Sequence, residues 1–192
     1  MSLRLSGGRR LQSPPGELAR PTAARVRQAV FNLLAPQLAG CRWLDLCCGS
    51  GVMACEALQR GASQVVAVEQ DRRIAAVARA NLVAVAGGLR RQEPPPSFAV
   101  LQAEVLSWLA RPDDAQAQRS AGFDLIYADP PWPIDLHSAI AAAVAEGHWL
   151  SAGGTLVWEC PSARVPQPPS GWRLRDSRRY GGSTVVLLEA AA

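Results

Sequence analysis

The chain has 192 residues, 48% of them hydrophobic, and a formal net charge of +4. This length and hydrophobic content suit one domain with a sizeable core and exclude a disordered chain. No apolar run approaches the roughly 18 residues that are needed to cross a membrane. The first ten residues, MSLRLSGGRR, lack the apolar segment of a secretory signal. We therefore expect a single-domain cytoplasmic protein.

Basic residues concentrate at the two ends of the chain. Residues 1–42 hold seven Arg against one acid, and residues 164–192 hold five Arg against two acids. Residues 43–163 hold eight Arg against thirteen acids. Basic flanks of this kind are typical of contact with a polyanion such as nucleic acid. The acidic middle segment is expected to have a role other than contact with a polyanion.

The cysteines do not form a recognisable framework. There are five, and four of them fall within fifteen residues. An odd and crowded set does not suit disulfide bonds, and the spacing does not suit zinc. We expect small buried thiols and no metal site at Cys41, Cys47, Cys48, Cys55 and Cys160.

The first forty residues predict an arm followed by a helix. Turn signals at Gly7-Gly8 and Pro14-Pro15 predict an irregular arm over residues 1–20. Apolar residues at helical spacing then predict a helix from Pro21 to Leu34, with Thr22 as a possible cap and Pro36 as the stop.

From residue 42 onward, predicted strands and helices alternate. Strands are expected over residues 42–46, 65–69, 98–102, 123–128 and 155–159, and a closing hairpin over 172–178 and 184–189. Helices are expected after residue 51 to about residue 60, and over 71–85, 105–109 and 136–146. Alternation of this kind predicts parallel βαβ units, whereas the short link of the last pair requires antiparallel pairing. The fold class is therefore α/β, with a seven-stranded, mostly parallel sheet and an antiparallel terminal hairpin.

A glycine-rich loop follows the first predicted strand. The segment from Asp45 to Gly51 reads DLCCGSG and opens a helix, and Glu69 closes the second strand. Glycines let the backbone approach a ligand, and an acid after the second strand suits ribose hydroxyls, as in dinucleotide folds. However, a carboxylate at Asp45 would repel a pyrophosphate. It suits a cationic amino group instead, such as that of S-adenosylmethionine.

The sequence Asp129-Pro130-Pro131-Trp132 follows the fourth predicted strand. The two prolines fix the backbone, so that the Asp129 carboxylate and the Pro130 carbonyl lie beside each other. Two acceptors next to an aromatic face suit a planar amine, which Trp132 would stack against. Positioning of this kind is a large part of catalysis when the amine attacks an electrophile.

These motifs resemble those of the Rossmann-like S-adenosylmethionine-dependent methyltransferases, and more narrowly the RsmD family of 16S rRNA guanine-N2 methyltransferases. The resemblance extends over nearly the whole chain. Three stretches carry it: residues 20–32, which begin RPTAARVR, residues 45–62, and residues 129–132. The chain has Glu104 where the family usually has Asp, the Cys47-Cys48 pair where an aromatic residue and Ala are common, and Trp132 where Tyr or Phe is common.

The resemblance implies a Rossmann-like methyltransferase fold, in which a basic arm and helix (residues 1–40) pack on a methyltransferase domain (residues 41–192). The catalytic residues are expected to be Asp129, Pro130, Pro131 and Trp132. S-adenosylmethionine is expected to contact Asp45, Cys47, Gly49, Ser50, Gly51, Glu69, Gln70, Glu104, Val105 and Thr22. The RNA-binding residues are expected to be Arg9, Arg10, Arg20, Arg25, Arg27, Arg178 and Arg179.

The expected activity is methylation of a guanine N2 amine by a monomer that acts on 16S rRNA, either free or within an assembling 30S particle. The target base must be extruded or lie in a loop, because a stacked base is unreachable. An adenine-N6 methyltransferase is a second hypothesis, disfavoured because 192 residues leave no room for a separate target-recognition domain. A non-catalytic nucleic-acid-binding module is a third hypothesis, which the acids at positions 45, 69 and 129 disfavour. An NAD-dependent oxidoreductase is a fourth, which has no need of the basic flanks.

Overall fold

The computed structural model describes residues 3–14, 24–89, 93–111, 122–132, 134 and 136–191. The first part of the chain forms α1 (Ala24–Leu33), α2 (Ala35–Leu38), β1 (Arg42–Leu46), α3 (Val52–Gln59), β2 (Gln64–Glu69) and α4 (Arg72–Gly88). The rest forms β3 (Ser97–Gln102), α5 (Val105–Leu109), β4 (Phe123–Ala128), α7 (His137–Glu146), β5 (Leu150–Pro161), β6 (Trp172–Tyr180) and β7 (Ser183–Ala190).

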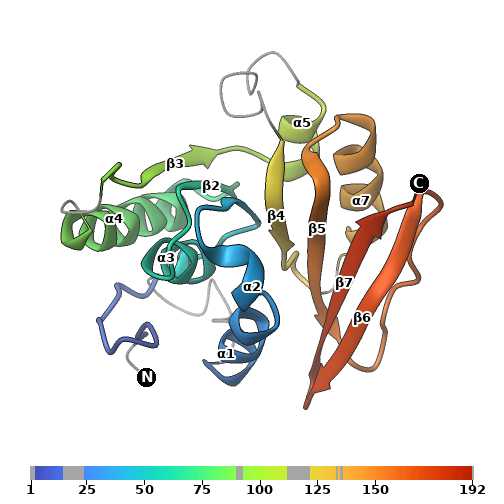
Figure 1. Ribbon diagram of the computed structural model, residues 1–192, viewed down its shortest axis with the longest axis horizontal. Coiled ribbons are helices and arrows are strands. Elements are labelled where there is room, and N and C mark those ends of the chain that lie inside the picture. The colour runs from blue at the N-terminus through green and yellow to red at the C-terminus, as the bar shows by residue number, and fades with distance from the viewer. Residues whose placement is uncertain are drawn as a thin grey trace.

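The strands form one seven-stranded sheet in the order β3-β2-β1-β4-β5-β7-β6 (Figure 1). Strands β1 to β5 pair in parallel, and β7 is antiparallel to both of its neighbours, β5 and β6. The predicted α/β class, the strand number and the antiparallel hairpin are therefore confirmed. The chain runs outward from β1 to β3 and then returns to β4 on the other side of β1. In open α/β sheets, ligands bind at the carboxyl ends of the strands where the order switches in this way.

Several element boundaries differ from the prediction by one to three residues, such as the end of α4 at Gly88 rather than residue 85 and the end of β6 at Tyr180 rather than residue 178. Helix α1 ends at Leu33, one residue before the predicted end, and Pro36 lies in the first turn of the short helix α2, where the missing N–H of proline removes no helical hydrogen bond. Strand β5 begins at Leu150 rather than at residue 155, and its pairing with β4 changes register near Phe123. Gly154 permits this irregular start, because a Cβ atom there would lie 3.0 Å from the carbonyl oxygen of Phe123.

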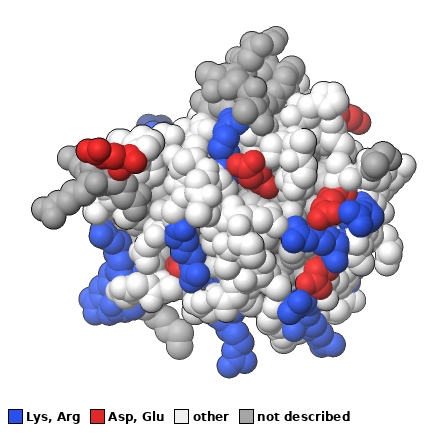
Figure 2. Space-filling view, in the orientation of Figure 1, with Lys and Arg blue, Asp and Glu red and all other residues white. Residues whose placement is uncertain are grey.

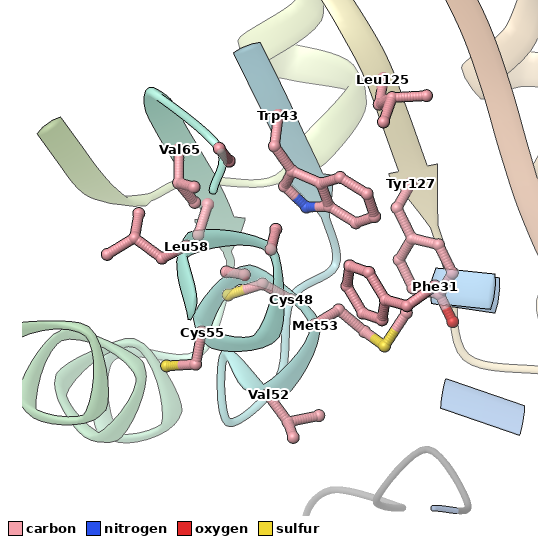
Figure 3. Close-up of a cluster of buried hydrophobic side chains, with 14 of the residues drawn as sticks. Phe31, Trp43, Cys48, Val52, Met53, Cys55, Leu58, Val65, Leu125 and Tyr127 are labelled. Atoms are coloured by element: carbon pink, nitrogen blue, oxygen red, sulfur yellow. The ribbon is translucent and has the colours of Figure 1, made fainter. Parts of the chain in front are cut away.

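Helices cover both faces of the sheet. Helices α3 and α4 lie on one face, and α5 and α7 lie on the other (Figure 1). On the first face, the buried rings of Phe31, Trp43 and Tyr127 come from α1, β1 and β4 (Figure 3). The ring centroids of Phe31 and Trp43 are 5.3 Å apart, and those of Trp43 and Tyr127 are 6.1 Å apart. This stack fixes α1 against the sheet.

A buried ion-pair network holds the N-terminal arm and α1 against α3. The carboxylate of Glu56 is fully buried and accepts a hydrogen bond of 3.0 Å from the backbone N–H of Ser6. It pairs with Arg60 at 2.8 Å and with Arg27 at 3.6 Å. Leu5 also places its side chain in the core. One acid on α3 therefore joins two segments that precede β1.

The network corrects one predicted RNA contact. Arg27 was expected to meet phosphate, but it is only 5% exposed. Its guanidinium pairs with Glu56 and donates a hydrogen bond of 2.6 Å to the backbone oxygen of Arg4. The expectation was wrong because basic character in the sequence does not reveal an internal acid that pairs with the arginine.

In the part of the chain that the structure describes, no helix is long and apolar enough to span a bilayer. No group of three or more His, Cys, Asp or Glu side chains among these same residues is arranged to hold a metal ion. The five cysteines are free thiols, and only Cys47 is more than marginally exposed.

We predict that Glu56→Gln destabilises the protein by about 3 kcal/mol at neutral pH, because it leaves the buried Arg27 without its carboxylate. Burial alone would raise the pKa of Glu56, but hydrogen bonds from Ser6 and Arg60 and the charge of Arg60 hold it below its ordinary 4.5. The ionised Glu56 therefore stabilises the folded state above pH 4.5, and this contribution is lost as the pH falls through the lowered value. Urea unfolding at pH 7 and pH 3 measures the difference.

The matched control is Glu146→Gln, which changes an exposed glutamate at the end of α7. It should leave the unfolding free energy within about 0.5 kcal/mol of the wild type. If Glu56→Gln behaved like this control at pH 7, the network would not be what holds the arm and α1 in place.

Candidate active site

The loop between β1 and α3 is shaped by two glycines in the left-handed region. Gly49 has a φ of 54° and Gly51 a φ of 73°, conformations that other residues rarely adopt. A Cβ atom at Gly51 would lie 3.1 Å from the Cβ of Ala78 on α4, whereas a Cβ atom at Gly49 would meet nothing within 4 Å. Gly51 therefore permits close helix packing, and Gly49 leaves an open backbone face at the carboxyl edge of the sheet.

Glu69, the last residue of β2, fixes this loop. Its Oε2 accepts a hydrogen bond of 2.9 Å from the N–H of Gly49, and its Oε1 accepts one of 2.9 Å from the N–H of Asp71. Glu69 is 8% exposed. The predicted acid and the predicted glycine are thus in direct contact, although they are 20 residues apart in the sequence.

Cys47 lies where the ends of four strands meet. Its backbone is left-handed, with a φ of 61°. Burial raises the pKa of its thiol to about 12, and nearby carboxylates add to the rise: Glu69, Asp45, Asp129 and Glu104. These acids belong to or follow β2, β1, β4 and β3. The four predicted acids therefore lie around Cys47, and their negative charges keep its thiol neutral.

Asp45 carries a buried carboxylate. It is 1% exposed, and its Oδ2 accepts a hydrogen bond of 2.9 Å from the N–H of Ala54. Burial raises its pKa to about 8, and the charge of Glu69 adds to the rise, while the Ala54 bond opposes it. Among the described residues, no arginine forms an ion pair with Asp45. A positively charged ligand group would favour its ionised form.

The Asp-Pro-Pro-Trp segment turns away from the end of β4. Ala128, the last residue of β4, is in register with Leu46 on one side and with Trp158 on the other. Asp129 and Trp132 are half-buried, and Pro130 is buried between them. A hydrogen bond of 3.0 Å from the N–H of Ile134 to the carbonyl oxygen of Pro131 closes the turn. The segment therefore lies beside the glycine loop.

Sequence reasoning missed a buried acid beside this corner. The hydroxyl of Tyr127 donates a hydrogen bond of 2.6 Å to Oε2 of Glu159, and both residues are buried. The β4–β5 register places Glu159 opposite Asp129, one residue beyond the Ala128–Trp158 pair. Burial raises the pKa of Tyr127, and the charges of Asp129 and Glu159 raise it further, so the phenol remains a neutral donor. The available signal was an acid near the end of a predicted strand, as with Glu69.

The expected cofactor contacts Glu104 and Val105 follow the end of β3. Glu104 caps α5, since its carboxylate accepts hydrogen bonds of 3.0 Å from the N–H of Leu106 and 2.8 Å from that of Ser107. Val105 is buried in the core, and Gln70 is exposed. Helix capping is thus a structural use of Glu104 that the sequence interpretation did not include. Thr22, another expected cofactor contact, lies outside the described residues.

Most of the predicted RNA-binding arginines are exposed. On the face shown in Figure 2, basic side chains gather over its lower half, and several acids lie among those on the right. Arg178 pairs with Asp176 at 2.9 Å yet keeps 55% of its side chain exposed. Arg20 lies outside the described residues. The others are exposed in the structure: Arg9, Arg10, Arg25 and Arg179.

The strand order together with this carboxyl edge defines the class. A seven-stranded sheet with a glycine loop after β1, an acid at the end of β2 and a proline-stiffened corner after β4 is that of the Rossmann-like S-adenosylmethionine-dependent methyltransferases. A solved rRNA methyltransferase of Streptomyces viridochromogenes, aviRa, has this fold. It aligns with a TM-score of 0.66 and 19% identity over 92% of this chain and 88% of its own.

The chain belongs to the family described as conserved hypothetical protein 95, whose model matches residues 5–189. The Escherichia coli (strain K12) protein named ribosomal RNA small subunit methyltransferase D is 28% identical over 96% of this chain and 86% of its own length. A solved hypothetical protein of Thermus thermophilus aligns with a TM-score of 0.71 and 26% identity, over 94% of this chain and 92% of its own. The resemblance to the RsmD family is thereby confirmed.

We predict that Asp45→Asn stabilises the ligand-free protein at pH 8. The folded-state pKa of Asp45, about 8, lies above its ordinary 3.8, so the stability associated with its protonated form is lost as the pH rises from about 4 through 8. Asparagine keeps an oxygen for the Ala54 N–H and never ionises. Urea unfolding of both proteins between pH 4 and 9 should give curves that diverge as the pH rises. Parallel curves would show that Asp45 is not strained by burial.

Proposed function

We propose that this protein transfers a methyl group from S-adenosylmethionine to the exocyclic N2 amine of a guanine in 16S rRNA. The observation that carries the proposal is the position of the Asp129–Trp132 corner beside the glycine loop, in which Cys47 lies among acids that belong to or follow four strands. The relative in Escherichia coli is named for methylation of small-subunit rRNA, which supports the choice of substrate.

The chain offers a suitable site for the cofactor. The buried Asp45 is the counter-charge for its ammonium group, since no arginine of the described residues pairs with it. The open backbone face of Gly49 admits the ligand, and Glu69 is next to that face to accept from ribose hydroxyls. Glu104 and Val105 follow the end of β3, where the adenine would lie. When bound, the cofactor supplies an electrophilic methyl group on a sulfonium.

The corner after β4 holds the acceptor amine. The carboxylate of Asp129 and the carbonyl of Pro130 accept its two hydrogens, and the half-buried Trp132 stacks on the base. These contacts direct the nitrogen lone pair toward the methyl group, so the chain contributes mainly orientation. The acidity of the amine rises once it is methylated, so the release of its proton needs no strong general base.

The exposed arginines supply binding to the phosphate backbone. Arg25 lies in the first turn of α1, a helix that contacts β7. Arg178 and Arg179 lie on β6, the edge strand next to β7. Contacts of this kind hold RNA without reading its sequence. We take the acting form to be a monomer in the cytoplasm that meets 16S rRNA either free or in an assembling 30S particle.

We predict that Asp129→Ala lowers the rate of methyl transfer by about 100-fold or more, because one of two amine acceptors is lost. The assay supplies S-adenosylmethionine with a labelled methyl group and unmodified 16S rRNA, and locates the label by mass spectrometry of nucleosides. Wild-type protein should yield N2-methylguanosine. Label on the N6 atom of adenosine would instead support the adenine-N6 activity, and absence of label would contradict methyl transfer.

Asp129→Asn is the matched control, since its amide oxygen still accepts a hydrogen bond. It should keep activity within about tenfold of the wild type. Both variants should bind S-adenosylhomocysteine as tightly as the wild type in calorimetry. Equal rates for wild type and Asp129→Ala would remove the corner from the reaction.

We predict that Arg25→Glu weakens binding of 16S rRNA and lowers its dependence on salt by about one unit of logarithmic slope per lost phosphate contact. Affinity for S-adenosylhomocysteine should not change. The control is Arg111→Glu, which reverses an exposed charge after α5. If both substitutions had the same effect on the slope, α1 would not form part of the RNA-binding surface.

A further inference from the structure

A single buried amide joins the N-terminal arm to the glycine loop. Asn81 on α4 is 2% exposed. Its Nδ2 donates hydrogen bonds of 3.0 Å to the backbone oxygen of Gln12 and 2.9 Å to that of Ser50. Its Oδ1 accepts one of 2.8 Å from the N–H of Gln12. Both amide hydrogens are used, and the three partners fix the orientation of the side chain.

The loop end of this connection lies within the candidate cofactor site. Ser50 lies between the two left-handed glycines and is 6% exposed. One position further, Gly51 abuts Ala78, which is one turn before Asn81 on α4. Helix α4 therefore contacts the loop backbone at two adjacent points. Loss of the Asn81 bond would leave the buried carbonyl of Ser50 without this donor.

The arm end of the connection carries basic charge. Residues 3–11 fold back on themselves, with hydrogen bonds of 2.9 Å from the N–H of Leu5 to the oxygen of Arg9 and from the N–H of Leu11 to the oxygen of Leu3. Leu5 and Leu11 are buried against the core. Arg10 and its bridge partner Arg4 remain exposed. The arm thus offers cations to solvent while its backbone is bonded to Asn81.

We propose that Asn81 is a positioning residue that couples the docked arm to the conformation of the cofactor loop, so that RNA on the arm and S-adenosylmethionine on the loop strengthen each other's binding. The identity of the two ligands rests on the proposed function. An arm that leaves its place removes two of the three bonds that orient the Asn81 amide. Only the bond to Ser50 then remains, and one bond does not fix the orientation of the Asn81 amide. Any ligand that favours the docked arm consequently favours the ordered loop, and the reverse holds equally.

The first test uses two substitutions at Gln12. Its two hydrogen bonds to Asn81 are made by the backbone N–H and carbonyl oxygen of Gln12. Gln12→Pro removes the N–H that Asn81 accepts from, whereas Gln12→Ala keeps it. We expect Gln12→Pro to weaken binding of S-adenosylhomocysteine by about 5-fold, measured by calorimetry without RNA, and Gln12→Ala to have no effect. Equal affinities for the two variants would overturn the proposal.

Asn81→Ala tests the same connection from the helix. It should weaken S-adenosylhomocysteine binding by about 10-fold, since both the arm and Ser50 lose their partner. If this variant does not fold, the comparison of the two Gln12 variants carries the test alone, because both leave Asn81 in place. Melting temperatures of all proteins identify a general loss of structure.

The second test measures reciprocity. In the wild type, saturating S-adenosylhomocysteine should raise affinity for transcribed 16S rRNA by about 5-fold or more, and the RNA should raise affinity for S-adenosylhomocysteine by the same factor. In Gln12→Pro both factors should approach one. A wild type that binds both ligands with no mutual effect would overturn the coupling. A wild type that does not bind the RNA would contradict the proposed function, and the comparison of the Gln12 variants would still decide the role of Asn81.

Discussion

The hydrogen bond between the N–H of Gly49 and the carboxylate of Glu69 is the contact on which the site depends. It joins the loop after β1 to the end of β2, at a glycine whose backbone is left-handed. With the loop held in this way, Cys47 lies among acids that belong to or follow four strands. The same bond leaves the open face of Gly49 toward the carboxyl edge, beside the corner that begins at Asp129. In the proposed function, cofactor binding and amine binding thus share one structural origin.

Around this site, the protein uses buried polar groups to fix segments that hydrophobic packing alone would leave loosely placed. Glu56 joins the arm and α1 to α3, and Asn81 joins the arm to the glycine loop. Each buried group is satisfied by several partners, so the removal of one partner is costly. Asp45 differs, because it is buried with only a backbone donor among its described partners and its pKa rises to about 8. A site that is strained without its ligand is typical of binding residues, which reduce stability in exchange for function.

Most of the fold follows from the sequence, because apolar periodicity and alternation determine βαβ units and short links determine hairpins. The corner at Asp129 and the loop at Gly49 were also predictable, since proline and glycine restrict or free the backbone locally. The partners of buried polar groups were not. Arg27 looked like a phosphate ligand until the structure showed Glu56 beside it, and the bonds from Tyr127 to Glu159 and from Asn81 to Ser50 join residues 32 and 31 positions apart. Tertiary contacts of this kind leave no local pattern in the sequence.

The most direct measurement is a crystal structure of the protein with S-adenosylhomocysteine. The ligand should lie across the carboxyl ends of β1 and β2, with its amino group at Asp45, its ribose hydroxyls at Glu69 and its sulfur facing the side chain of Asp129. A ligand bound elsewhere on the sheet, or an Asp129 carboxylate turned away from the sulfur, would contradict the proposal that the proline-stiffened corner presents an amine to the methyl donor.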